Sequence, residues 1–218
     1  MNVKRLYREY RARREQFDLL SLAATHQLDH AIKSKRIKIH SLPYRIKSFD
    51  SFAEKARGKN LTDPFNEIHD IVGLRVVCLF LSDLPKVGKV IEDTFHLIAK
   101  DDKIDGRPKN VFGYMDIQYV VSLEQNVIEK IRGMQFEIQV RTITQDAWAS
   151  ISHHLDYKQR KMIPEEWERD FQAISGLFYV ADQHFRILNE ESLRTLSIEG
   201  TVGCASNAKG RLETDGEK

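Results

Sequence analysis

The sequence predicts an α+β fold in which helices flank a mixed β-sheet, with long helices toward both ends of the chain. Three observations lead to this prediction. The N-terminal stretch is rich in Arg, Glu, Leu and Ala and contains no Pro or Gly. The run IVGLRVVCLFL is apolar and β-branched, as expected of a central strand. The segment MQFEIQVRT alternates apolar and polar residues, which is the period of a half-buried strand.

The first part of the chain reads as helical. Residues 3–38 carry a rough apolar stripe at helical spacing, and the stretch Ser41-Leu42-Pro43 interrupts it. A second helix is expected over residues 48–57, because Gly58 and Asn60 follow it as typical helix-end residues.

The middle of the chain predicts a strand over residues 71–81 and a helix after Asp83, with Pro85 in its first turn. This helix is expected to carry an apolar stripe of Val87, Val90, Ile91, Thr94 and Ile98. The charged stretch at residues 101–110 then predicts a loop.

Two further strands are expected over residues 114–123 and 134–142, followed by a helix over 144–158. A last helix opens at Pro164. From about residue 196 the composition has few large apolar groups, which predicts a disordered tail. The expected organisation is an N-terminal helical segment (1–42), a core (43–160), a C-terminal helix (161–195) and the tail (196–218).

Composition excludes several classes of protein. No apolar run reaches the length of a membrane span, and the N-terminus lacks the apolar region of a secretory signal. The two cysteines, Cys78 and Cys204, cannot form a disulfide framework, so the cytoplasm is the expected compartment. A P-loop and a dinucleotide-binding glycine motif are both missing. The His69-Asp70 pair and His153-His154 lack the further ligands of a hydrolase metal centre or a zinc site.

Charge is unevenly distributed, although the net charge is only +2. Residues 31–60 contain nine Lys and Arg but two Asp and Glu. A block of this sign can bind polyphosphate or nucleic acid, or it can be a solvated basic helix face.

Strand parity groups the polar side chains. In the strand over 134–142, Glu137, Gln139 and Arg141 share one face. In the strand over 114–123, polar residues also share a face: Tyr114, Asp116 and Gln118. Two adjacent polar faces can form the floor of a ligand site, or simply the wet side of a sheet.

Asp70 and Arg75 bracket the start of the strand over 71–81. Simple alternation sends them to opposite faces, unless a bulge at Gly73 brings them together or Asp70 precedes the strand. An acid at this place can hold Mg²⁺ together with substrate phosphates, or it can cap an element.

These motifs together resemble the synthetase domain of the RelA/SpoT family, in particular its stand-alone small alarmone synthetases. The resemblance covers about residues 43–158 and rests on four ordered segments: YRIKSFDSFAEKARGK, HDIVGLRVVC, PKNVFGY and FEIQVRTITQDAWASISHHLDYK. It implies a nucleotidyltransferase-like synthetase fold and transfer of pyrophosphate from ATP to the 3′-hydroxyl of a guanine nucleotide.

The resemblance also implies residue roles. Asp70 and Glu137 would be the catalytic acids and Mg²⁺ ligands. The ATP phosphates would be contacted by Arg45, Lys47, Lys55, Arg57, Lys59 and Arg75. The acceptor pocket would be formed by Tyr114, which stacks on the base, and by Asp116, Gln118, Gln139, Arg141 and His153.

The sequence departs from the family at two of these positions. The family reads G-Y-x-S-x-H, whereas Asp116 stands at the Ser position and Gln118 at the His position. A carboxylate there would repel an approaching phosphate, pair with a nearby Lys or Arg, or select a different acceptor. Three interpretations follow: an alarmone synthetase, a toxic relative that modifies an adenine nucleotide or the 3′ end of tRNA, or a catalytically weak nucleotide-binding module. The resemblance also raises a homo-oligomer and an antitoxin as partners.

Overall fold

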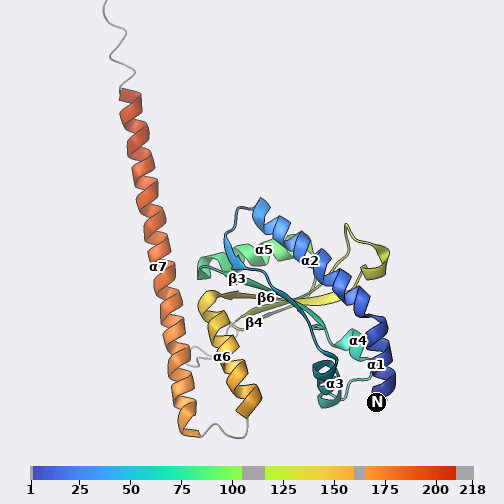
Figure 1. Cartoon of the computed structure of the whole chain (residues 1–218). Coiled ribbons are helices and arrows are strands. Elements are labelled where there is room, and N and C mark those ends of the chain that lie inside the picture. Colours follow the sequence, from blue (N-terminus) through green and yellow to red (C-terminus); the bar gives the residue numbers. More distant parts are fainter. Residues whose placement is uncertain (1, 105–115, 160–164, 210–218) are drawn as a thin grey trace, which may run out of the picture.

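The computed structural model describes residues 2–104, 116–159 and 165–209. Its centre is a six-stranded mixed sheet (Figure 1). The strands are β1 (Ile39–Ser41), β2 (Tyr44–Ile46), β3 (Val72–Cys78), β4 (His96–Asp102), β5 (Ile117–Ser122) and β6 (Gln135–Thr142). The order is β1-β3-β6-β5-β4, and β2 also pairs with β3. Among the described strands, β3 and β6 pair in parallel and the other pairs are antiparallel, which confirms the predicted mixed sheet.

Helices account for most of the remaining described residues. They are α1 (Val3–Ala12), α2 (Arg14–Ser34), α3 (Phe49–Gly58), α4 (Pro64–Glu67), α5 (Leu84–Thr94), α6 (Ile143–Gln159) and α7 (Glu165–Lys209), with 3₁₀ turns η1 (Leu81–Asp83) and η2 (Glu129–Ile131). Helices α2 and α5 cover one face of the sheet, and α6 lies on the opposite side (Figure 1).

The core lies between the sheet and α2 and α5. Its strand residues are those of one parity, such as Leu74 in β3, Ile138 in β6 and Tyr119 in β5, all at most 2% exposed. Burial of such side chains from water is the main favourable term in folding. The other parity of the same strands is therefore left for polar groups, as the sequence predicts.

The N-terminal helix is divided, contrary to the prediction of one helix over residues 3–38. It breaks at Arg13, whose guanidinium lies over the Phe65 ring at 4.0 Å from the centroid. Helix α1 then turns toward α3, where Tyr7 packs edge-on against Phe49. Tertiary packing of this kind overrides helix propensity. The helix also ends earlier than expected, at Ser34.

The prediction that a helix extends to Ile98 and that a loop begins at residue 101 is wrong. Helix α5 ends at Thr94, and β4 forms the edge of the sheet over His96–Asp102. Nearly all of β4 is exposed, so its sequence carries no alternation between apolar and polar residues.

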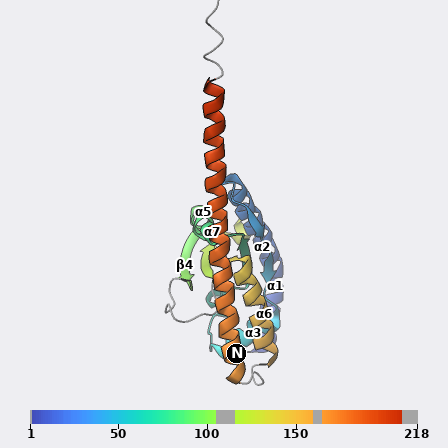
Figure 2. The same cartoon turned by 90° about the vertical axis from the view of Figure 1, so that its left-hand side faces the viewer.

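Helix α7 continues to Lys209, past the residue at which the sequence predicts a disordered tail. Residues 196–209 contain no proline, and extending an existing helix adds one hydrogen bond for each residue fixed. The far part of α7 extends past the sheet and its covering helices (Figures 1 and 2). The division of the chain at residues 42, 160 and 195 stays a prediction. Within the described ranges, no helix combines the length and apolar composition needed to cross a membrane.

Candidate active site

Polar side chains from four strands meet on the face of the sheet opposite the core. In the register of the sheet, Arg45 of β2 lies beside Gly73 of β3, and Gly73 lies beside Glu137 of β6. Because residue 73 has no side chain, the Arg45 side chain can lie against this position: Arg45 Cγ and Nε are 3.8 and 3.9 Å from where a Cβ would stand. The next polar row joins Arg75, Gln139 and Gln118 from β3, β6 and β5. The predicted grouping by parity is confirmed for Glu137 and Gln139 of β6 and for Gln118 of β5.

Asp70 lies just before β3 and is held by two lysines. Lys47 Nζ is 2.9 Å from one carboxylate oxygen, and Lys55 Nζ is 2.9 Å from the other. Burial alone would raise the pKa of Asp70, but the hydrogen bonds and charges of these lysines outweigh it and lower the pKa. The strand register is regular at Gly73, so the suggested bulge there is wrong and Asp70 precedes the strand.

Local structure positions both lysines. Ser48 caps α3, accepting a hydrogen bond from the Ser51 backbone N–H at 3.3 Å, and this helix carries Lys55. The Lys47 carbonyl accepts a hydrogen bond from the Tyr10 hydroxyl of α1. The basic segment therefore enters the site on a fixed strand and a capped helix.

Glu137 lies close to Asp70. Burial, and then the negative charge of Asp70, raise the pKa of Glu137, whereas Gln139, Lys55 and Arg45 act in the opposite direction. Gln139 Nε2 donates a hydrogen bond of 2.6 Å to Glu137 Oε1. The two acids predicted from the sequence therefore converge on the same cationic cluster.

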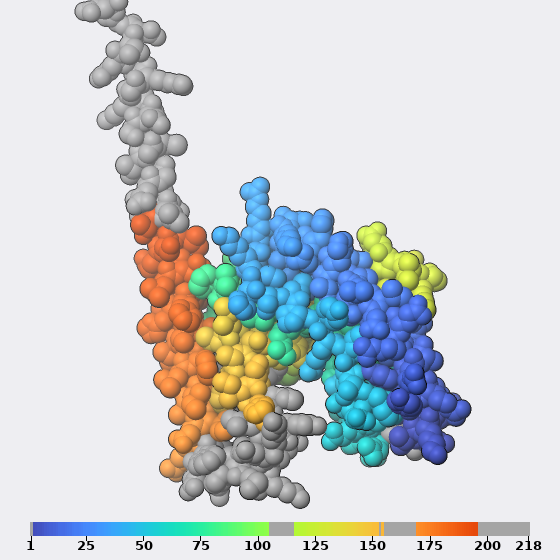
Figure 3. Space-filling model, viewed as in Figure 1, coloured from blue at the N-terminus to red at the C-terminus, as the bar shows by residue number. Residues whose placement is uncertain are grey.

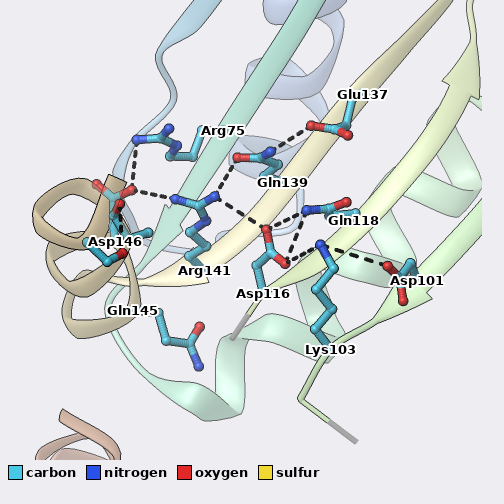
Figure 4. Close-up of polar contacts among 12 residues, drawn as sticks. Arg75, Asp101, Lys103, Asp116, Gln118, Glu137, Gln139, Arg141, Gln145 and Asp146 are labelled. Atoms are coloured by element: carbon cyan, nitrogen blue, oxygen red, sulfur yellow. Dashed lines mark hydrogen bonds and ion pairs between the residues drawn. The ribbon is translucent and has the colours of Figure 1, made fainter. Parts of the chain in front are cut away.

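Arg141 is the centre of the polar network beyond Glu137 (Figure 4). Its guanidinium donates to Gln139 at 2.7 Å, to Asp116 at 3.3 Å and to Asp146 at 3.3 Å. Only 3% of Arg141 is exposed. Burial, followed by the charge of Arg75, lowers the pKa of Arg141 to about 10, while Asp146 opposes this shift.

Asp116 is fully buried and paired. Its carboxylate lies 3.3 Å from Arg141 Nη2 and 3.6 Å from Lys103 Nζ, and it accepts a hydrogen bond from Gln118 Nε2 at 3.1 Å (Figure 4). Burial raises the pKa of Asp116, and Gln118 and Lys103 act against that shift. Of the expectations for this acid, the pairing with a nearby Lys or Arg is confirmed.

Arg75 is anchored from the other side of the network. Its Nη1 donates to Asp146 Oδ1 at 2.8 Å, so one carboxylate joins Arg75 to Arg141. The Arg75 Nε is buried and has no hydrogen-bond partner among the described residues. A buried donor of this kind is costly unless it is satisfied, and an incoming polar ligand is one way to satisfy it.

Four of the predicted site residues are not placed in this cluster. Arg57 and Lys59 are exposed near the end of α3, and Arg57 Nε contacts only the Ala53 carbonyl of its own helix, at 3.4 Å, among its described hydrogen bonds. Tyr114 and the side chain of His153 lie outside the described residues.

Two residues of the cluster, Asp146 and Lys103, were not predicted as site residues. Asp146 lies in the first turn of α6 and Lys103 follows β4. A signal for Asp146 is present in the sequence: Thr142-Ile143-Thr144-Gln145 has the Thr-x-x-Gln form of a capping box, which predicts a helix starting beside the end of β6. Lys103 has no such signal, because it follows a strand that the sequence does not reveal.

The two acids fit Mg²⁺. This ion is commonly held by one or two carboxylates, with substrate phosphates and waters completing the shell. Among the described residues no group of three or more His, Cys, Asp or Glu side chains is arranged to hold a metal. A metal at Asp70 and Glu137 would therefore depend on a phosphate ligand. Each Asp70 oxygen bonded to a lysine still has a second lone pair for such an ion.

Comparison with known proteins shows which family the chain resembles. A family model described as "Region found in RelA / SpoT proteins" matches residues 44–162. GTP pyrophosphokinase YwaC of Bacillus subtilis (strain 168) is 28% identical over 153 residues, covering 67% of this chain and 72% of YwaC.

Two solved structures extend the likeness. A GTP pyrophosphokinase family protein from Streptococcus pneumoniae has a TM-score of 0.76 at 22% identity, covering 87% of this chain and 97% of that chain. Small alarmone synthetase 1 from Bacillus subtilis, bound to its product pppGpp, has a TM-score of 0.65 at 28% identity, covering 81% and 96%. Since the family model matches more than half of the chain, including Asp70 and Glu137, this chain belongs to the RelA/SpoT family.

Proposed function

We propose that this chain transfers the β,γ-diphosphate of ATP to the 3′-hydroxyl of a guanine nucleotide, the reaction that makes (p)ppGpp. The observation that carries the proposal is the convergence of Asp70 and Glu137 beside Lys47, Lys55 and Arg45. Relatives named as GTP pyrophosphokinases and a relative bound to pppGpp support the same reaction.

The donor side would be the cationic cluster around Asp70. Lys47 and Lys55 both have an Nζ at the Asp70 carboxylate, and Arg45 is exposed beside Gly73. Phosphoryl-type transfer depends mainly on positioning and on cations that offset the charge of the phosphates. These three side chains would bind the triphosphate, with Arg75 adding a fourth cation from the next row of β3.

Mg²⁺ would be held by Asp70 and Glu137, and when bound it would offset charge on the phosphate oxygens. The lowered pKa of Asp70 keeps this carboxylate ionised at neutral pH, as a metal ligand must be. The raised pKa of Glu137 makes it the better proton acceptor of the two.

Glu137 would therefore accept the proton of the 3′-hydroxyl as that oxygen forms its bond to the β-phosphorus. The bond between the β-phosphorus and the oxygen bridging to the α-phosphate breaks, and AMP leaves with the bonding electrons. Gln139, which donates to Glu137 at 2.6 Å, would hold the carboxylate in one orientation during this exchange.

The acceptor side would be formed by Gln139 and Gln118 of the second polar row, above the Arg141 network. Because Asp116 is paired with Arg141 and Lys103, it presents no free negative charge to an acceptor phosphate. This neutralised charge leaves room for an acceptor bearing a 5′-diphosphate or triphosphate, and the relatives named as GTP pyrophosphokinases support guanine as its base. Stacking by Tyr114 and contact with His153 remain predictions from the resemblance.

The test is incubation of the protein with γ-³²P-ATP and Mg²⁺ and, in separate reactions, GDP, GTP, ATP or deacylated tRNA. The β,γ-diphosphate carries the label, so we expect a labelled guanine nucleotide. Label in a pyrophosphorylated adenine nucleotide or on tRNA instead would overturn the assigned acceptor and favour the toxic relative. ATP binding without transfer to any acceptor would overturn the enzymatic proposal and favour a nucleotide-binding module.

A further inference from the structure

Helix α7 packs against α6 through aromatic side chains, and one acid is buried in that contact. Trp148 of α6 lies 5.4 Å from Phe171 and 6.3 Å from Phe178 of α7, between ring centroids. Asp182 of α7 lies further along the same helix and is only 4% exposed. Figures 1 and 3 show α7 running alongside α6, on the side of the molecule away from α1.

Asp182 is bonded to the end of the strand that carries Glu137 and Arg141. The Thr142 hydroxyl, on the last residue of β6, donates to Asp182 Oδ2 at 2.6 Å. The Thr144 hydroxyl lies 3.0 Å from the Thr142 hydroxyl in the same buried group. An apolar residue in this place would avoid the cost of removing a carboxylate from water, so the acid is expected to provide orientation rather than packing.

Thr142 also caps the N-terminus of α6. Its hydroxyl oxygen accepts from the Gln145 backbone N–H at 3.2 Å, and Gln145 Oε1 accepts from the Thr142 backbone N–H at 3.0 Å, which is a reciprocal capping box. A hydroxyl has one proton to donate. When that proton points to Asp182, the oxygen lone pairs are left for the Gln145 N–H.

The first turn of α6 then determines where two arginines of the site are held. Asp146 follows Gln145 directly and bonds Arg75 at 2.8 Å and Arg141 at 3.3 Å (Figure 4). A small rotation of this turn would move the carboxylate and, with it, both guanidinium groups.

We propose that Asp182 is a positioning residue for the transfer reaction, acting through the Thr142 hydroxyl and the first turn of α6 on Asp146, Arg75 and Arg141. Helix α7 thus contributes to the site although none of its described side chains is among the residues assigned to the nucleotides or the metal. The inference rests on the proposed function for its effect on rate, but its structural part stands without it.

The test compares two pairs of variants with a packing control. Asp182→Ala and Thr142→Val remove the hydrogen bond, whereas Asp182→Asn and Thr142→Ser retain an acceptor and a donor. Phe178→Leu weakens the contact between α6 and α7 without touching Thr142. Each variant is measured for melting temperature, for kcat with ATP and GDP, and for the Nε–H resonances of Arg75 and Arg141 in the nucleotide-free protein.

We expect Asp182→Ala and Thr142→Val to shift both arginine resonances and to lower kcat roughly tenfold or more, because a remote misplacement of about 1 Å can cost ~100-fold in rate. Asp182→Asn and Thr142→Ser should stay close to the unaltered protein in both readouts. Phe178→Leu should lower the melting temperature and leave the arginine resonances in place.

The proposal is overturned if Asp182→Ala changes kcat and the resonances no more than Phe178→Leu does at equal loss of stability, since the acid would then serve packing alone. It is equally overturned if Asp182→Asn is as impaired as Asp182→Ala. Should Asp182→Ala fail to fold, Asp182→Leu, which fills the space, removes the acceptor and leaves the Thr142 cap of α6 in place, decides between the same outcomes. An unaltered protein without transfer activity would refute the proposed function, and the arginine resonances would still test the positioning role.

Discussion

The carboxylate of Asp70 lies close enough to Glu137 that its negative charge raises the pKa of Glu137. Two acids in such proximity repel each other when both are ionised, and the fold offsets this repulsion with Lys47 and Lys55 on Asp70. A divalent cation would offset it further. This pair of acids is the basis of the predictions that follow.

Replacing either acid should remove transfer and keep the fold. Asp70→Asn is expected to abolish it, and Glu137→Gln should lower kcat by roughly 10²–10⁴-fold, the usual contribution of a general base. The matched control is Glu54→Gln, an exposed acid on α3, which should leave the rate unchanged. Transfer of ³²P to GDP measures the rate, and circular dichroism checks the fold. An Asp70→Asn protein of full activity would refute the assignment.

The same two variants should change stability in opposite directions at neutral pH. The pKa of Glu137 is higher in the folded than in the unfolded protein. Its favourable contribution to the free energy of unfolding is therefore present below the unfolded pKa and is lost as the pH rises through the folded pKa. Glu137→Gln should therefore raise the melting temperature at about pH 8 and change it little near about pH 4.

The pKa of Asp70 is lower in the folded than in the unfolded protein. Its favourable contribution to the free energy of unfolding is therefore present above the unfolded pKa and is lost as the pH falls through the folded pKa. Asp70→Asn should lower the melting temperature at neutral pH by roughly 2–4 °C for each kcal/mol lost in a chain of this size. Calorimetry at both pH values measures the two effects. If both variants shifted the melting temperature in the same direction at neutral pH, the proposed arrangement of charges around Asp70 and Glu137 would be contradicted.

The coupling between the acids is open to direct titration. In Asp70→Asn the charge that raises the pKa of Glu137 is gone, so the Glu137 carboxyl should titrate at lower pH than in the unaltered protein. The measurement is the ¹³C shift of the Glu137 carboxyl carbon against pH. A titration midpoint that does not move would mean that the two groups are not electrostatically coupled.

Gly73 keeps open the space between Arg45 and Glu137. A Cβ at this position would stand 3.8 Å from Arg45 Cγ, which is ordinary contact, so the strand itself tolerates a side chain. Gly73→Val should retain stability, because Val is favoured in strands, and should weaken binding of a non-hydrolysable ATP analogue. Gly58→Ala, where nothing lies within 4 Å of the added Cβ, is the control. Unaltered binding by Gly73→Val would place the triphosphate elsewhere.

Asp116 should matter for both stability and acceptor use. Asp116→Ser removes a fully buried partner of Arg141, and breaking a buried pair costs on the order of 3 kcal/mol. Asp101→Ser, at an exposed acid that also contacts Lys103, should cost far less.

The double change Asp116→Ser with Gln118→His should raise GDP use, because Arg141 is then less neutralised. Equal melting temperatures for the two single variants, or an unchanged rate with GDP, would contradict these expectations.

The sequence predicts the polar residues on the strands of the site more fully than the contacts that hold them in place. Glu137 and Gln139 fall on one face because a strand alternates sides, and this local rule holds in β6 without knowledge of its neighbours. The family resemblance adds Lys47, Lys55 and Asp70. The structure brings these residues together in two ion pairs.

The supporting contacts depend on packing that no local pattern reveals. Arg75 and Asp146 are 71 residues apart and meet only because α6 starts where β6 ends, beside β3. Lys103, which contacts Asp116, directly follows the edge strand β4, and the exposure of β4 leaves no alternation by which the sequence could reveal it. Asp182 is a similar case: its helix is predicted, but its bond to Thr142 follows from how α7 docks on α6.

The most direct measurement is a crystal structure of the protein soaked with Mn²⁺ and a non-hydrolysable ATP analogue, with anomalous data to locate the metal. We predict a metal peak bound by Asp70 and Glu137 together with phosphate oxygens, at distances of about 2.0–2.2 Å, close to those of Mg²⁺. The triphosphate should lie along Lys47, Lys55 and Arg45. A metal bound by neither acid, or a triphosphate away from those three cations, would contradict this site.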